Sequence, residues 1–224
     1  MNPIDIFFNM SVLSRAFPML LQGLWYTLAL GATAIVLGTV LGVLICIIRL
    51  YGPKPLRLLA ILYIDLIRAI PVLVLLILIY YALPFGGITM SSFTAAASAL
   101  VMVLAAFTAE VVRAGIQAIP KGQFEAADAL GMGFWLSMRK VILPQAVRIV
   151  IPPQASNCVL VMKDTALASV VASSDLLKQA TDAQALFANP TPLIGAALIY
   201  IAILWPLVRL TNWLEVRSQR AYTR

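Results

Sequence analysis

The 224-residue chain contains no histidine, and this absence excludes several kinds of site. Without an imidazole there is no histidine general base, no histidine metal ligand and no histidine-centred catalytic triad. There is also no Gly-x4-Gly-Lys-[Ser/Thr] phosphate loop, so we do not expect the chain to hydrolyse a nucleotide itself. Two cysteines, Cys46 and Cys158, lie in apolar runs that we place toward opposite membrane faces, so we expect no disulfide between them. We therefore predict neither a catalytic site nor a metal site.

Charged residues are scarce as well, at 11% of the chain, against about 25% in a typical soluble domain. Apolar residues make up 62%, and the mean hydropathy is +0.97. These values indicate an integral membrane protein. The net charge of +7 could suggest a nucleic-acid partner, but lysine and arginine gather in short segments between apolar runs, which is typical of membrane proteins. We therefore expect a lipid bilayer, and no nucleic acid, around this chain.

The apolar runs predict an all-α membrane protein that forms a single transmembrane domain over residues 1–224. Each run is long enough, at about 1.5 Å per residue, to cross a hydrocarbon core of about 30 Å. We expect residues 1–19, which are mildly amphipathic, to lie along the outer face. Five spans follow, at approximately 20–49, 57–83, 92–118, 141–162 and 192–213.

The charges between the spans predict their orientation. Basic residues gather in the 119–140 loop, in the C-terminal tail and around the 50–56 linker, where Lys54 lies between Arg49 and Arg57, whereas the 84–91 turn carries no charge. The 163–191 segment holds three aspartates against two lysines. Because basic loops stay in the cytoplasm, the N-terminus is expected outside and the 119–140 loop inside.

The 119–140 loop contains a short polar stretch with strong helix formers, Glu125–Leu130 (EAADAL). The Gly-Met-Gly run that begins at Gly131 is typical of a helix C-terminus. Leu143 and Pro144 then open the next apolar run. A hydrophobic chain that exposes such a helix to the cytoplasm offers a surface that a soluble partner can bind.

This stretch resembles the EAA loop of ABC importer permeases, the cytoplasmic coupling helix that docks into an ATPase subunit. The family spacing is Glu-Ala-Ala, three residues, Gly, nine residues, Ile, one residue and Leu-Pro, and this sequence fits it with Val141 in place of Ile. The resemblance implies the type I ABC importer fold, with five transmembrane helices and the coupling helix between spans three and four. It assigns ATPase coupling to Glu125, Ala126, Ala127, Gly131, Leu143 and Pro144.

Other segments are similar to the branch that imports polar amino acids, including Arg68-Ala-Ile-Pro71, the run from Glu110 to Gln123, and Lys163-Asp-Thr-Ala-Leu. The residue at Ala166 departs from the family, where we would expect serine. The branch implies a non-catalytic, multi-pass subunit of the bacterial cytoplasmic (inner) membrane. Its implied partners are two ATPase copies, a second copy or homologue of the permease, a solute-binding protein and an amino-acid substrate. This chain would bind no cofactor, because ATP and Mg²⁺ are used by the ATPase.

Four charges fall inside spans two and three: Asp65, Arg68, Glu110 and Arg113. If the two spans form a hairpin about residues 87–88, Arg68 should lie near Glu110, and Asp65 near Arg113. Charges at membrane depth usually face protein or water and mark functional sites. One reading is a charged gate or a path for a zwitterionic solute, in which Arg68 binds a carboxylate and Glu110 an ammonium group. The alternative is a salt-bridged clamp at the inner interface.

Span four contains Pro152 and Pro153, which should interrupt the helix and free the carbonyls near Arg148. Broken helices in transporters often mark the solute site, so Gln154 and Asn157 are further candidates for the substrate path. The alternative is a kink shaped by packing, with amides bonded to neighbouring helices.

A stand-alone ion-coupled transporter or channel would also explain charges within the membrane. It would not explain the cytoplasmic Glu125 helix, and uptake that needs internal ATP and an external binding protein would separate the two. A purely structural subunit is the third alternative.

Overall fold

The computed structural model describes residues 7–222 and the side chains of residues 7–217. Within that part every regular element is helical. The predicted all-α class is therefore confirmed. The α-helices are α2 (Met10–Tyr51), α3 (Lys54–Ala69), α4 (Val72–Ile77), α5 (Ser92–Gln117), α6 (Lys121–Ala129), α7 (Phe134–Ser137), α8 (Leu143–Asp164), α9 (Leu176–Phe187) and α10 (Thr191–Tyr222). Shorter π and 3-10 turns join some of them: η1 (Leu78–Ala82), η2 (Leu83–Gly86), η3 (Met138–Ile142) and η4 (Thr165–Val171).

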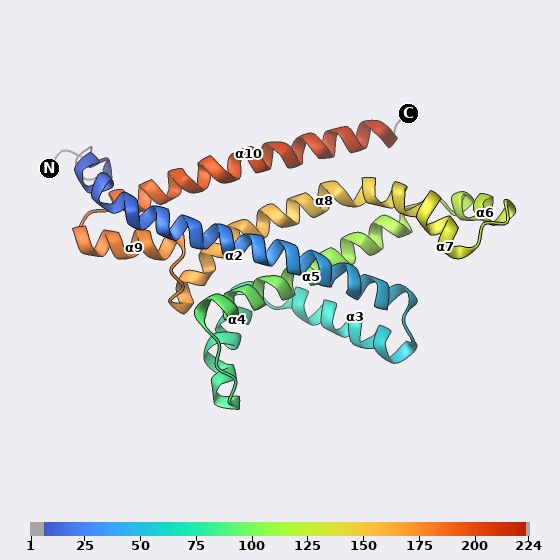
Figure 1. Cartoon of the computed structure of the whole chain (residues 1–224), viewed down its shortest axis with the longest axis horizontal. Coiled ribbons are helices and arrows are strands. Elements are labelled where there is room, and N and C mark those ends of the chain that lie inside the picture. Colours follow the sequence, from blue (N-terminus) through green and yellow to red (C-terminus); the bar gives the residue numbers. More distant parts are fainter. Residues whose placement is uncertain (1–6, 223–224) are drawn as a thin grey trace.

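Helices α2 and α5 form the central pair of the bundle and lie along each other over most of their length (Figure 1). Small residues permit this close approach. At Gly42 of α2, a Cβ atom would lie 2.5 Å from Cβ of Thr108 and 2.7 Å from the carbonyl oxygen of Ala105. The alanines of α5 that face α2 are buried for the same reason.

The second predicted span is bent rather than straight. We predicted one span over 57–83, but α3 and the α4 segment that follows meet at an angle of 106°. The bend lies at Ile70, which is extended (φ −89°, ψ 130°) because Pro71 disfavours the helical conformation of the residue before it. Beyond the bend, α4 packs on α5 and η4, and the chain then continues through η1 and η2 to a turn at Gly87, which projects from the side of the bundle, before it returns into α5 (Figure 1).

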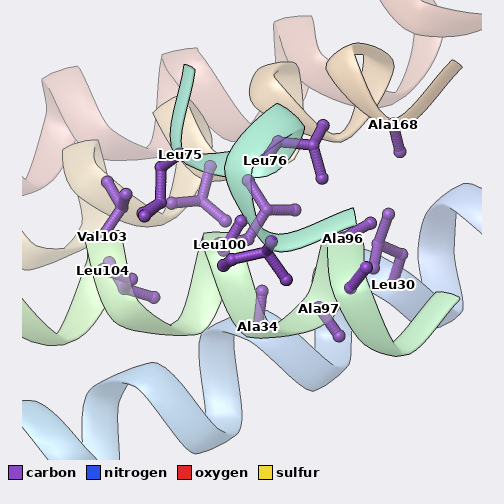
Figure 2. Packing of buried hydrophobic residues seen from close by; sticks show 14 of the residues in the cluster. Leu30, Ala34, Leu75, Leu76, Ala96, Ala97, Leu100, Val103, Leu104 and Ala168 are labelled. Atoms are coloured by element: carbon purple, nitrogen blue, oxygen red, sulfur yellow. The ribbon is translucent and has the colours of Figure 1, made fainter. Parts of the chain in front are cut away.

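The largest apolar cluster lies where α4, α2, α5 and η4 meet. Figure 2 shows Leu75 and Leu76 of α4 beside Leu100 of α5, with Ala34 of α2 beneath them. All four side chains are buried, and close packing of such side chains is what holds helices together in a lipid environment. This cluster holds the bent segment against the central pair.

Three helices of the described part, α2, α5 and α10, are long and apolar enough to cross a membrane alone, and two bent helix pairs bring the total to as many as five. Helices α6 and α7 project from one end of the bundle, and α9 lies at the opposite end beside the start of α2 (Figure 1). Of the N-terminal segment 1–19, residues 1–6 lie outside the described residues, and Met10 onward already belongs to α2. The orientation of the bundle in the membrane stays a prediction.

Candidate functional site

Helix α6 carries the Glu-Ala-Ala motif and begins earlier than the sequence predicted. It runs over Lys121–Ala129 rather than starting at Glu125. Glu125 and Ala126 face solvent, whereas Ala127 is buried. Phe124 packs into a small apolar cluster with Ile142 at the base of the segment. The motif therefore presents one polar face outward from a helix that is fixed to the bundle on its other side.

Gly131 ends α6 by adopting the left-handed conformation, with φ at +70°. The backbone N–H of Met132 donates to the carbonyl of Ala127 (3.0 Å), and the N–H of Gly131 donates to that of Asp128 (2.9 Å). This pair of bonds is the Schellman motif, which satisfies the last carbonyls of a helix. A Cβ at Gly131 would meet no atom within 4 Å, so the backbone conformation alone favours glycine there.

Leu143 and Pro144 stand at the point where the segment joins α8. The preceding turn η3 is π-helical, and the N–H of Leu143 donates to the carbonyl of Met138, five residues earlier. Since Pro144 has no N–H to donate, a wider turn before it is a common local solution. Both side chains are exposed beside the α6 segment.

Large apolar side chains lie exposed on the same projection. Trp135 is 82% exposed and Leu130 80%, and Phe134 and Leu136 are also exposed. The ring of Phe134 meets that of Tyr51, the last residue of α2, at a centroid distance of 5.4 Å. We define Lys121–Leu136 as the docking segment: a polar motif flanked by exposed apolar side chains and linked to the end of α2. Exposed apolar groups of this kind mark a surface that contacts either the membrane or another protein.

The charged residues of the spans form one cluster, which we call the Glu110 cluster. The Glu110 carboxylate pairs with Arg49 of α2, with Arg113 one turn along α5 (2.7 Å) and with Arg68 of α3 (3.9 Å). Arg113 also donates to the amide oxygen of Gln117 (2.5 Å). One carboxylate thus joins three helices near the end from which the docking segment projects.

The assumption of a hairpin centred on residues 87–88 predicted one of the two expected ion pairs correctly. The expected contact between Arg68 and Glu110 is present, but Asp65 is exposed and forms no ion pair with any residue of the described part. Arg113 turns back to Glu110 on its own helix instead. Arg49 was missed as a site residue because its sequence position next to a basic linker made it a topology signal. The bend at Pro71 also breaks the symmetry that the count assumed.

Arg68 is the most weakly bound cation of the cluster. Its side chain is 42% exposed, against less than a third for Arg49 and Arg113, and its guanidinium lies 5.6 Å from the ring centre of Phe107. An arginine placed over an aromatic face with free donors can bind a carboxylate in two-point fashion. Arg68 is therefore the member of the cluster best placed to reach a solute.

Gln154 and Asn157 lie within the bundle, on a helix that the prolines do not break. Helix α8 continues through Pro152 and Pro153, so the predicted interruption is absent. The Gln154 amide donates to the hydroxyls of Thr108 (2.9 Å) and Thr39 (3.2 Å). Its oxygen and the Asn157 amide nitrogen are inaccessible and have no partner among the described residues. Gln154 therefore links α8 to α2 and α5, and each of the two amides retains one polar atom without a hydrogen bond.

Comparison with known families identifies a match over residues 34–221. The matching model describes the binding-protein-dependent transport system inner membrane component. The match includes the docking segment, the Glu110 cluster and both amides of α8.

Individual relatives cover almost the whole chain. The chain is 36% identical to the probable glutamine ABC transporter permease protein GlnM of Bacillus subtilis (strain 168), over 96% of this chain and 100% of the relative. It is 34% identical to the L-cystine transport system permease protein TcyB of the same organism, over 91% of this chain and 88% of the relative. A crystal structure of an amino acid ABC transporter with histidines superimposes with a TM-score of 0.86 at 36% identity, over 92% of this chain and 96% of that one.

Proposed function

The chain belongs to the family of binding-protein-dependent transport system inner membrane components, and on that premise we propose that it is the permease subunit of an ATP-driven amino-acid importer. It would form the translocation path for an amino acid that a solute-binding protein delivers at the outer face of a bacterial cytoplasmic membrane. The chain has a transport role, and a separate ATPase subunit binds and hydrolyses ATP with Mg²⁺.

The observation that carries this proposal is the docking segment. A membrane protein that keeps Trp135 and Leu130 exposed beside a short polar helix has a surface suited to a soluble partner. We assign that partner as the ATPase subunit, present in two copies because a second permease copy or a homologue would complete the pore. Glu125 and Ala126 face this partner, and Gly131 ends the helix that carries them.

Force would reach the bundle along two contacts of the docking segment. One runs through η3 into α8, which follows without a break at Leu143 and Pro144. The other runs through Phe134 to Tyr51 and so to α2. Movement of the ATPase would therefore displace the two helices that bear Gln154 and Arg49.

The solute itself is an amino acid, which agrees with the relatives described as glutamine and cystine permeases. We place Arg68 on the path as the group that meets its carboxylate, because that guanidinium is the exposed one. Gln154 and Asn157 would contact polar atoms of the solute. Glu110, Arg113 and Arg49 act mainly as a clamp between helices, and Asp65 adds negative charge beside them.

Two substitutions of Gly131 provide a matched test. Gly131 has a positive φ, which asparagine tolerates far better than a β-branched residue, and a Cβ there meets open space. Gly131→Val should distort the end of α6 and lower ATP-dependent uptake at least about tenfold, whereas Gly131→Asn should keep most of it, since a left-handed β-branched residue costs roughly 1–2 kcal/mol or more. The assay is uptake into vesicles with internal ATP and external binding protein, with co-purification of the ATPase as a second measurement.

Glu125→Lys tests the same surface through charge. Glu125 is exposed and makes no ion pair within the described part, so the reversal should leave insertion and stability unchanged and reduce ATPase binding and uptake. Normal uptake and normal ATPase co-purification in both Gly131→Val and Glu125→Lys would refute the docking role.

A further inference from the structure

A second group of buried polar side chains lies at the end of the bundle opposite the docking segment. It is formed where the start of α9 packs against α2, η4 and α10. Four of its members are at most 2% exposed, and the fifth, a tyrosine, has an inaccessible hydroxyl. We call this group the Asp175 cluster: Thr27, Thr165, Ser173, Asp175 and Tyr200.

Asp175 is the only carboxylate of this cluster, and only one of its oxygens is satisfied. Oδ1 accepts a hydrogen bond from the backbone N–H of Lys178 (3.2 Å) and so caps the first turn of α9. Oδ2 is inaccessible to solvent and has no hydrogen-bond partner among the described residues. An ionised carboxylate in that position loses hydration without gaining a second partner, which is costly.

Within residues 7–217, no cation pairs with Asp175 from the helices around it. On α9, the ammonium group of Lys178 pairs with Asp182 at the surface. Helix α2 presents Thr27, whose hydroxyl accepts from the N–H of Leu176 (3.0 Å), and η4 presents Thr165, whose hydroxyl donates to the carbonyl of Met162 (2.7 Å). The titratable groups within electrostatic range of Asp175 are thus Lys178 and Tyr200.

The hydroxyls near the carboxyl are themselves unsatisfied. Ser173 Oγ and the Tyr200 hydroxyl are inaccessible and make no hydrogen bond of good geometry within the described part. The Tyr200 hydroxyl nevertheless lies close to the hydroxyls of Thr27 and Thr165. Dense packing keeps solvent out, because a Cβ at Gly23 of α2 would fall 2.8 Å from Cα of Leu176. Because solvent is excluded, a neutral carboxylic acid is buried there at a much lower cost than a carboxylate anion.

We propose that the Asp175 carboxyl is a proton-binding site, and that the proton on Oδ2 sets how firmly α9 is seated on α2 and α10. With the proton bound, the cluster is neutral and the start of α9 stays buried. When the proton leaves, a buried anion without a counter-ion favours exposure of the carboxylate, and therefore release of the start of α9.

The effect on transport rests on the proposed function. Helix α9 would lie at the outer end, where the solute arrives, so its release would accompany opening of the path. Acidic surroundings should then hold the outer end closed, and neutral surroundings should free it.

The direction of the pH dependence follows from burial. Burial raises the pKa of the Asp175 carboxyl from 3.8 to about 6, and the backbone N–H groups of Lys178, Leu177 and Asp175, together with the Lys178 charge, oppose this rise only in part. A carboxyl with a higher pKa in the folded state binds its proton more tightly there than in the unfolded state. Its stabilising effect is therefore greatest below about pH 4, is lost as the pH rises to about 6, and changes little above that value.

Thermal unfolding of the purified full chain in detergent, between pH 4.5 and pH 7.5, tests the site without any transport assay. The Tm of the wild type should fall by about 3–5 °C more between pH 5 and pH 7 than that of Asp175→Asn. Asparagine retains the cap acceptor and cannot ionise, so Asp175→Asn should also have the higher Tm at pH 7.5. Asp65→Asn is the control, because Asp65 is exposed and makes no ion pair within the described residues, and its pH dependence should equal that of the wild type.

Two results would overturn the proposal. One is an equal change of Tm with pH in the wild type and Asp175→Asn. The other is a sodium- or potassium-dependent rise in Tm at pH 7.5 that Asp175→Asn abolishes, because the carboxylate would then hold a metal cation in place of a proton. Uptake by the reconstituted importer gives a separate measurement: between pH 5 and pH 7 it should rise more steeply in the wild type than in Asp175→Asn, and equal profiles would refute the gating role.

Discussion

Replacement of Glu110 by glutamine should have a large effect on stability, because its one carboxylate is the shared ion-pair partner of three arginines. Its oxygens contact Arg49 and Arg113 directly and lie 3.9 Å from Arg68. The variant would leave three guanidinium groups from three helices facing a neutral amide. The oxygen of that amide could still accept a hydrogen bond from one of them, so the loss is incomplete.

The expected cost is about 3 kcal/mol. Removal of one partner from a buried ion pair typically costs about 3–5 kcal/mol, and we take the lower limit because the Glu110 side chain is 16% exposed and its partners are 18–42% exposed. For a chain of this size, about 1 kcal/mol corresponds to roughly 2–4 °C in Tm. Glu110→Gln should therefore unfold about 6–12 °C below the wild type.

The assay is thermal unfolding of the purified permease in one detergent at fixed pH and salt. Asp65→Asn is the control, since it removes a carboxylate from α3 that makes no ion pair within the described residues, and it should shift Tm by less than about 2 °C. In a double variant, Arg49→Gln should recover part of the loss by removing one unpaired charge. A Tm for Glu110→Gln within about 2 °C of the wild type would refute the assignment of Glu110 as the clamp.

Two further variants separate transport from stability and test the packing of the central helices. Arg68→Gln should lower uptake about tenfold or more and cost less than about 1 kcal/mol in stability, because its ion pair is long and exposed; equal uptake would remove Arg68 from the substrate path. Gly42→Ala should destabilise the bundle by about 1–3 kcal/mol, since the added Cβ would lie 2.7 Å from the backbone oxygen of Ala105. Gly86→Ala, where a Cβ meets nothing, is its control in the same unfolding measurement, and an equal Tm for the two would contradict the close approach of α2 and α5.

The sequence was sufficient to predict the helical class and the position of most long helices. Hydrophobic length is a local property, and α5 at Ser92–Gln117 lies almost where the 92–118 run placed it. The end of α6 could also be predicted, because the left-handed conformation that ends it at Gly131 strongly favours glycine. Features that depend on a few neighbouring residues could thus be read without the structure.

The bend in the second span was missed although its cause is local. The extended backbone at Ile70 follows from Pro71, but hydropathy runs through the break without change. The reverse error occurred in α8, where two prolines suggested an interruption and the helix continues. Proline restricts the backbone, and tertiary packing decides whether the helix stops.

Contacts between segments far apart in the sequence were the hardest to predict. Arg49 reaches Glu110 across 61 positions, and Thr27 binds Leu176 across 149. Neither pairing has a signal in a single sequence, since both depend on how the helices cross. The Asp175 cluster was missed for the same reason: Ser173 and Asp175 stand in the polar 163–191 segment, which served only to orient the spans, and the structure buries both completely.

The length of α2 has a mechanical consequence. Its 42 residues extend about 63 Å at 1.5 Å per residue, roughly twice a hydrocarbon thickness of about 30 Å. At its first turn, the N–H of Asn9 donates to the hydroxyl of Thr191, and at its last turn Tyr51 meets the ring of Phe134. Because one continuous helix is tied at both extremities, a displacement imposed at one end is transmitted along it to the other, so the two ends of the bundle are linked through a single element.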